Sequence, residues 1–132
     1  MAKNTLGLVF FPAFDWMISP GHPERQERLL YTRDQLEEEG LFDCEEIKEY
    51  RPRLAEIEDL QRAHVGVPSI ARLITLAHLT SAGGCLAAAD AVMQREVQRA
   101  FALVRPPGHH AMRVVHGIRG FCTCLLYTSD AA

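Results

Sequence analysis

Apolar residues in this chain form short continuous runs that alternate with stretches of helical spacing. The run TLGLVFF at residues 5–11 is rich in β-branched and aromatic residues and predicts a buried strand. A second run, AFALVRPP at residues 100–107, ends in two prolines, which cannot continue a central strand. The segment CEEIKEY at residues 44–50 is interpreted as a further short strand, although glutamates interrupt it.

Four segments between these runs have the spacing or composition of helices. In the first, residues 24–39, Leu29, Leu30 and Leu36 recur near helical spacing. Pro23 stands at its start and Gly40 is a plausible C-terminal cap. The other three helices are expected at residues 54–64, 69–79 and 82–98.

Buried strands separated by amphipathic helices imply parallel β-α-β units and an α/β sandwich. The predicted strands are too few to cover the apolar surface of these helices. The chain is therefore interpreted as part of a larger domain, with an exposed sheet edge that favours aggregation when the chain is expressed alone.

Composition narrows the classes of function. The formal charge of −3 gives no basic stripe of the kind that neutralises nucleic-acid phosphates, so no direct nucleic-acid binding is expected. The four cysteines have no regular spacing, which argues against a disulfide framework. No leader precedes the first strand, and no apolar run approaches the roughly 18 residues of a membrane span. A cytoplasmic protein without a membrane association is expected.

The densest chemistry is the segment RPPGHHA at residues 105–111. Its prolines end the strand, Gly108 permits a sharp turn, and His109 and His110 follow where sites form in open α/β sheets. Two imidazoles that titrate near neutrality could divide proton transfer from electrostatic stabilisation. Two adjacent histidines are, by themselves, more often solvated or structural than catalytic, and that alternative stays open at this point.

Four segments in order resemble the histone deacetylase family, which includes acetoin-utilisation and acetylpolyamine deacetylases. RPPGHHA followed by GFC at residues 120–122 carries most of the resemblance. The others are HPER with a following arginine (22–28), AEIEDLQRAH (55–64) and AGGCLAAADAV (82–92), although Gln26 stands where the family more usually has proline.

The resemblance implies the amino-terminal part of an arginase/deacetylase-like three-layer α/β/α fold with a mainly parallel sheet. It implies a zinc-dependent deacetylase that acts on an acetylated lysine peptide or an acetylated small amine. His110 would be the general base and His109 its more buried partner. Phe121 would form a wall of the substrate tunnel, the Gly120 carbonyl would accept the substrate amide hydrogen, and Arg28 would line the pocket through which acetate leaves.

The chain departs from the family pattern after residue 122. No aspartate-x-histidine zinc pair occurs in its 132 residues, so the zinc ligands are expected beyond the end of this chain, and the chain itself is expected to bind no zinc. Residues 1–122 are taken as an incomplete deacetylase-like domain, and the tail TCLLYTSDAA at 123–132 as a truncation artefact. Two functional classes remain: a deacetylase in the full-length parent with an inactive fragment, or a non-catalytic binding or pseudo-enzyme remnant.

Overall fold

A three-stranded parallel sheet forms the centre of the molecule. The computed structural model describes residues 4–14, 20–63 and 76–108. The strands are β1 (Asn4–Phe11), β2 (Ile47–Tyr50) and β3 (Val97–Val104), in the order β2-β1-β3. Both neighbouring pairs are parallel. All three predicted strands and their parallel arrangement are confirmed.

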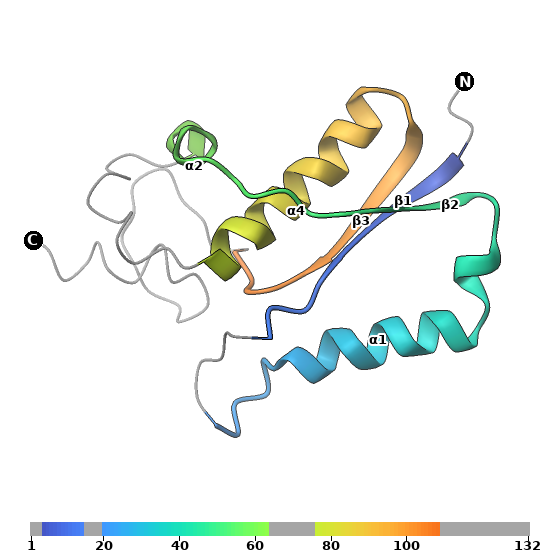
Figure 1. Ribbon diagram of the computed structural model, residues 1–132, viewed down its shortest axis with the longest axis horizontal. Coiled ribbons are helices and arrows are strands. Elements are labelled where there is room, and N and C mark those ends of the chain that lie inside the picture. The colour runs from blue at the N-terminus through green and yellow to red at the C-terminus, as the bar shows by residue number, and fades with distance from the viewer. Residues whose placement is uncertain (1–3, 15–19, 64–75, 109–132) are drawn as a thin grey trace, which may run out of the picture.

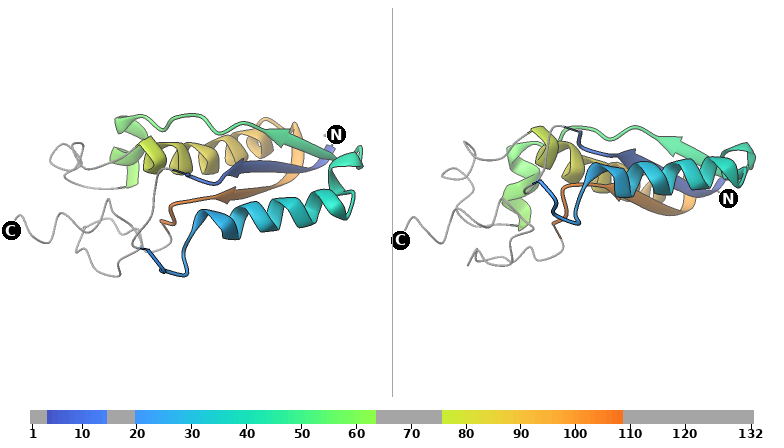
Figure 2. Two further views of the ribbon diagram at one scale, coloured as in Figure 1. Left: turned by 60° about the horizontal axis from the view of Figure 1, so that its bottom comes forward. Right: turned by 90° about the horizontal axis from the view of Figure 1, so that it is seen from below.

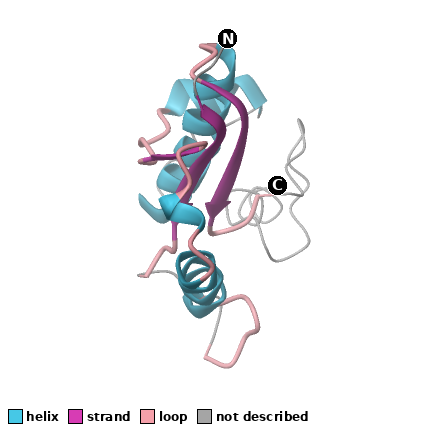
Figure 3. Cartoon of the chain, turned by 90° about the vertical axis from the view of Figure 1, so that its right-hand side faces the viewer, coloured by secondary structure: helices cyan, strands magenta, loops and turns pink. Residues whose placement is uncertain are grey.

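Helices lie on both sides of this sheet. Helix α4 (Leu76–Met93) packs against β1 and β3, and α1 (Gln26–Glu38) lies on the other side of the sheet (Figure 1). The left-hand view of Figure 2 shows β1 and β3 between α4 and α1, and Figure 3 shows the strands and helices from the side. The short elements η1 (Leu41–Asp43) and α2 (Ile57–Ala63) complete the described chain. The three-layer α/β/α arrangement expected from the sequence is therefore confirmed.

Successive side chains of β1 point to opposite faces of the sheet, so β1 has apolar side chains to bury on both faces. Val9 is fully buried and would contact a Cβ at Gly84 of α4, so this side chain faces α4. Phe10, the next residue, points to the opposite face, where the Arg33 guanidinium of α1 lies 5.6 Å from its ring centre. Leu8, on the face of Phe10, and Leu29 of α1 are also buried. A strand with apolar side chains on both faces is typical of a parallel sheet.

Two adjacent glycines bring α4 close to its neighbours. A Cβ at Gly84 would lie 2.9 Å from Val104 Cγ1, so the helix could not approach β3 as closely with a larger residue. A Cβ at Gly83 would overlap the carbonyl oxygen of Arg53. The segment before α2 runs along α4 at this point, and the N–H of Ala55 donates to the carbonyl of Leu79 (2.9 Å).

The predicted ends of the helices around α4 are wrong in two places. The helix is continuous between residues 79 and 82, where the sequence predicted a break between two helices; residues 69–75 of the first predicted helix lie outside the described residues. It also ends at Met93, because Arg95 adopts a left-handed φ of 59°. The N–H groups of Arg95 and Glu96 donate to the carbonyls of Val92 and Ala91, the Schellman pattern that closes a helix. This motif usually contains glycine, so the end of the helix could not be predicted from Arg95.

Helix α1 begins two residues later than predicted and ends as expected. Its first residue is Gln26, because Glu24 and Arg25 have extended or turn conformations at the entry to the helix. Gly40 has a left-handed φ of 72°, and its N–H donates to the carbonyl of Glu37 (2.9 Å). The predicted glycine cap is therefore confirmed.

A polar cluster closes the amino end of the sheet. Lys48 Nζ lies 2.7 Å from Glu96 Oε2, and the Tyr50 hydroxyl donates to the same oxygen at 2.9 Å. Hydrogen bonds from Lys48 and Tyr50 hold the pKa of Glu96 below its usual range. These contacts connect β2 across β1 to the start of β3.

Helix α4 has the length and apolarity of a membrane-spanning helix, with 18 residues and a mean hydropathy of 1.2. The expectation that no apolar run approaches the length of a membrane span is therefore qualified for α4. The same composition is typical of a core helix in a sheet protein, and α4 packs against β1 and β3. Part of the apolar surface of α4 therefore packs against the sheet.

We predict that Gly83→Ala destabilises the fold by about 2 kcal/mol, because overlap with the Arg53 backbone outweighs the gain of about 1 kcal/mol in helix propensity. Urea unfolding followed by circular dichroism measures the effect. Gly108→Ala is the matched control, since a Cβ there meets no atom of the described residues within 4 Å. Equal stability of the two variants would contradict the close approach of α4 to residue 53.

Candidate active site

A buried arginine organises the carboxyl ends of β1 and β3. Arg105 follows β3 directly and is only 1% exposed. Its Nε lies 3.0 Å from Glu24 Oε1, and its Nη2 lies 2.8 Å from Glu24 Oε2. This two-point geometry matches the planar guanidinium to the carboxylate. It ties the loop after β3 to the turn before α1, which is 81 residues earlier in the chain.

The same guanidinium also fixes the end of β1. Arg105 Nη1 donates to the carbonyls of Pro12 and Ala13, both at 2.8 Å. Ala13 has a left-handed φ of 51°, which costs a non-glycine residue about 1 kcal/mol. The two carbonyl contacts offset this strain and satisfy donors that would otherwise be buried without partners. Three chain segments therefore meet at Arg105.

Glu24 is the acidic counterpart of this arrangement. It is 7% exposed, and its own N–H donates to His22 Nδ1 at 3.0 Å. That contact gives His22 a structural role in the turn before α1. Arg28 Nη1 lies 3.5 Å from Glu24 Oε1, but the Arg28 side chain is 61% exposed. Glu24 thus lies between a buried and an exposed guanidinium.

Helix α4 holds the next residue of the loop. The Ser81 hydroxyl donates to the carbonyl of Pro106 at 2.8 Å, and this contact is buried. Gly108, two residues further on, is exposed. The start of the RPPGHH segment is therefore fixed from two sides, by Arg105 and by Ser81.

Only part of the predicted site falls within the described residues. Arg28 does, and it lies beside Glu24 at the entry to α1. Four other predicted site residues lie outside the described residues: His109, His110, Gly120 and Phe121. Their assigned roles stay predictions.

Sequence reasoning missed the roles of Glu24, Arg105 and Ser81. In the sequence, Glu24 and Arg105 stand out only as members of the HPER and RPPGHHA motifs. One signal was present, because an arginine that directly follows a buried apolar strand needs a carboxylate partner. The sequence did not indicate which of the 17 acidic residues would be that partner.

The described residues do not form a metal site. Within residues 4–14, 20–63 and 76–108, no group of three or more histidine, cysteine, aspartate or glutamate side chains could hold an ion together. These residues therefore do not fit the ligand set of a zinc centre, and any zinc would need ligands from elsewhere.

Comparison with known proteins identifies the family. Residues 68–125 match the family model described as the histone deacetylase domain. A "Probable deacetylase" from Archaeoglobus fulgidus is 40% identical over 122 residues, which cover 79% of this chain and 33% of that protein. These two matches support membership of the histone deacetylase family.

Two further similarities concern a shorter stretch of sequence and the fold. The polyamine deacetylase HDAC10 of Danio rerio is 52% identical over 42 residues, which cover 32% of this chain and 6% of that protein. The crystal structure of the HDA15 HD domain superposes with a TM-score of 0.74 at 22% identity, over 98% of this chain and 44% of that one. The second likeness concerns the fold alone. The chain spans about one third of the Archaeoglobus relative.

We predict that Arg105→Ala lowers the free energy of unfolding of this deacetylase-family chain by about 3–5 kcal/mol, because it leaves the buried Glu24 carboxylate without its main partner. Arg28→Ala is the matched control. It removes the exposed guanidinium from the same carboxylate and should cost less than about 1 kcal/mol. Urea unfolding of both variants measures the difference, and similar losses would contradict the dominant role of Arg105.

A pH effect is predicted for His78 of α4, whose pKa is lowered by burial. As the pH falls from 7 to 5, the unfolded chain takes up a proton at this residue more readily than the folded chain does. The free energy of unfolding should therefore decrease, at no more than about 1.4 kcal/mol per pH unit from this residue. His78→Leu should reduce that slope, and an unchanged slope would show that His78 does not contribute.

Proposed function

We propose that the protein to which this chain contributes is an amide hydrolase that removes acetyl groups from amines. Water adds to the amide carbonyl, the carbon–nitrogen bond breaks, and acetate and a free amine result. Membership of the deacetylase family supports this reaction class. The whole reaction is a proposal, because the chain spans only about one third of the Archaeoglobus relative.

One structural observation carries the proposal most directly. Arg105 and Glu24 bring the start of the RPPGHH segment and the HPER turn together at the carboxyl ends of β1 and β3. That edge is where sites form in open α/β sheets. A buried ion pair costs desolvation energy, so its use here is easier to explain by positioning of the loop than by stability alone.

Within this proposal the family roles are carried over residue by residue. His110 removes a proton from the attacking water and later donates one to the leaving amine, and His109 stabilises the charge that develops. Phe121 and the Gly120 carbonyl contact the substrate. Arg28 faces the leaving acetate, and its exposed guanidinium at the HPER turn is compatible with anion binding.

Zinc is proposed as the cofactor of the whole protein. In amide hydrolysis a bound zinc ion polarises the carbonyl and lowers the pKa of its bound water. The described residues do not provide its ligand set, so we propose that the ligands come from the remainder of the protein. Without them, the 132-residue chain is proposed to be inactive.

The substrate is proposed to be an acetylated lysine peptide or an acetylated small amine. The similarity to a relative named as a polyamine deacetylase supports the second of these. A narrow acyl-amine site needs neither a membrane nor a nucleic acid, and we propose that the protein acts in the cytoplasm.

A graft tests the activity. Residues 1–122 replace the aligned segment of the Archaeoglobus deacetylase, and acetate release is measured with an acetyl-lysine peptide and with an acetylated polyamine. We expect turnover that a chelator abolishes and zinc restores. His110→Ala should lower kcat at least about 100-fold, because general acid–base catalysis contributes about 10²–10⁴-fold.

Glu38→Ala is the control for the graft, since this exposed residue lies at the opposite end of α1 from Arg28 and the substitution should leave kcat unchanged. A folded graft that binds zinc but releases no acetate would contradict the proposed reaction. It would favour the alternative of a non-catalytic binding module for this segment.

A further inference from the structure

Two neighbouring hydroxyl residues of α4 use their hydrogen bonds differently. The Thr80 hydroxyl donates to the carbonyl of Leu76 in its own helix, at 2.8 Å. This contact to the preceding turn is the usual one for serine and threonine inside a helix. The Ser81 hydroxyl instead donates to the carbonyl of Pro106, 25 residues further along the chain and also at 2.8 Å. Ser81 therefore joins α4 to the loop after β3.

The Pro106 carbonyl lies at the start of the loop that leads to the two predicted catalytic histidines. Pro106 is buried, and a buried carbonyl that loses its donor is strongly disfavoured. Pro106 and Pro107 restrict the backbone here, because each proline ring fixes φ near about −65°. The direction of the chain toward His109 therefore depends on where the Pro106 carbonyl is held.

The turn of α4 that carries Ser81 is itself held closely. A Cβ at Gly84 would lie 2.9 Å from Val104 Cγ1, and a Cβ at Gly83 would overlap the carbonyl oxygen of Arg53. The helix thus contacts both the end of β3 and the segment before α2 within three residues of Ser81. A hydroxyl on this turn has a fixed origin from which to hold the loop.

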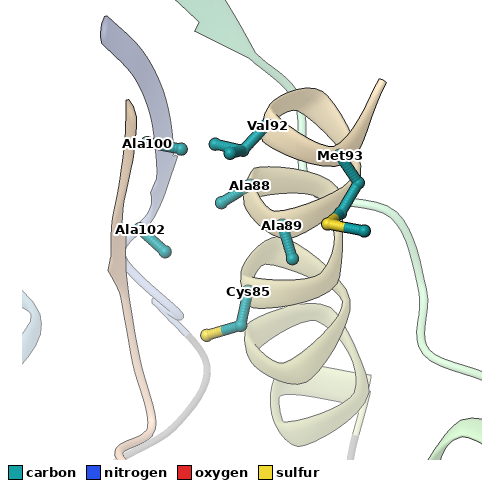
Figure 4. Close-up of a pocket in the computed structure, with 7 residues that line it drawn as sticks. All are labelled: Cys85, Ala88, Ala89, Val92, Met93, Ala100 and Ala102. Carbon is teal, nitrogen blue, oxygen red and sulfur yellow. The ribbon is translucent and has the colours of Figure 1, made fainter. Parts of the chain in front are cut away.

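The second half of α4 packs less closely against β3. An apolar groove of about 430 Å³ lies between the two elements, and four of the residues that line it are alanines. Figure 4 shows Cys85, Ala88 and Val92 pointing from α4 toward Ala100 and Ala102 of β3. The close contacts of α4 with β3 are therefore concentrated in the first half of the helix, next to the loop.

We propose that Ser81 is a positioning residue of the amide hydrolase. Its hydroxyl fixes the Pro106 carbonyl and thereby the course of the loop that carries His109 and His110. The catalytic roles of these histidines rest on the proposed function. Among the hydrogen bonds within the described residues, the Ser81 contact lies nearest to them in sequence. Arg105 anchors the residue before Pro106, so the ion pair and the Ser81 hydroxyl constrain successive points of the loop.

The graft of residues 1–122 into the Archaeoglobus deacetylase tests the effect on rate. Ser81→Ala should lower kcat about 10–100-fold and leave KM within about twofold, because a displaced reacting group slows the chemical step more than it weakens substrate binding. Thr80→Ala is the matched control. It removes the neighbouring hydroxyl, whose hydrogen bond stays within α4, and should leave kcat within about twofold.

Ser81→Cys separates the hydrogen bond from the filling of space. The thiol occupies the position of the hydroxyl but is a weak donor, so kcat should lie between the values of the unsubstituted graft and Ser81→Ala. A kcat equal to that of the unsubstituted graft would show that volume, and not the hydrogen bond, sets the position of the loop.

NMR spectroscopy of the full 132-residue chain provides a measurement that does not depend on turnover. The imidazole resonances of His109 and His110, assigned with His109→Gln and His110→Gln variants, should shift in Ser81→Ala. They should stay in place in Thr80→Ala, because that substitution leaves the Pro106 carbonyl with its donor.

Three results would overturn the proposal. The first is that Ser81→Ala leaves the histidine resonances unchanged. The second is an equal effect of Thr80→Ala on the resonances or on kcat, which would indicate a general disturbance of α4. The third is an active graft in which Ser81→Ala changes only KM. An unsubstituted graft without acetate release would count against the proposed function instead, and the histidine resonances would then decide the role of Ser81 by themselves.

Discussion

The buried pair of Arg105 and Glu24 is the interaction on which the arrangement of the described chain depends. The Arg105 guanidinium contacts Glu24 in the turn before α1 and two main-chain carbonyls at the end of β1, and Arg105 itself directly follows β3. Removal of either charge would leave the other in a region that water does not reach. The hydrophobic sheet sets the layers, but this pair sets the position of the loop that leads to His109.

The location of the ion pair links the fold to the proposed chemistry. A parallel sheet places the carboxyl ends of its strands at one edge, so segments distant in sequence meet there. Ser81 of α4 adds a second attachment to the same loop through Pro106. Catalytic loops need supports of this kind, because small displacements of a reacting group greatly reduce the rate. We therefore regard Glu24, Arg105 and Ser81 as positioning residues of the proposed site.

The side edge of the sheet at β3 differs from the edge formed by the carboxyl ends of the strands. β3 has an apolar groove on one face and an exposed phenylalanine on the other. The polar cluster of Lys48, Tyr50 and Glu96 connects β2 to the residue before β3 at the amino end of the sheet. The chain covers about one third of its Archaeoglobus relative, and no strand in the described part of the chain pairs with this side of β3.

The sequence by itself determined the three strands, their parallel arrangement, the α/β class and the similarity to the family. Continuous apolar runs and local motifs can be recognised without knowledge of distant contacts. It also identified Gly40 as a cap, since only glycine readily adopts that backbone conformation. It did not determine the end of α4, where Arg95 takes the left-handed conformation instead of a glycine. Only the tertiary structure paired Arg105 with Glu24 and seated Gly83 against Arg53. Such contacts join residues far apart in the chain, and local sequence patterns carry no information about which distant partner the fold will bring near.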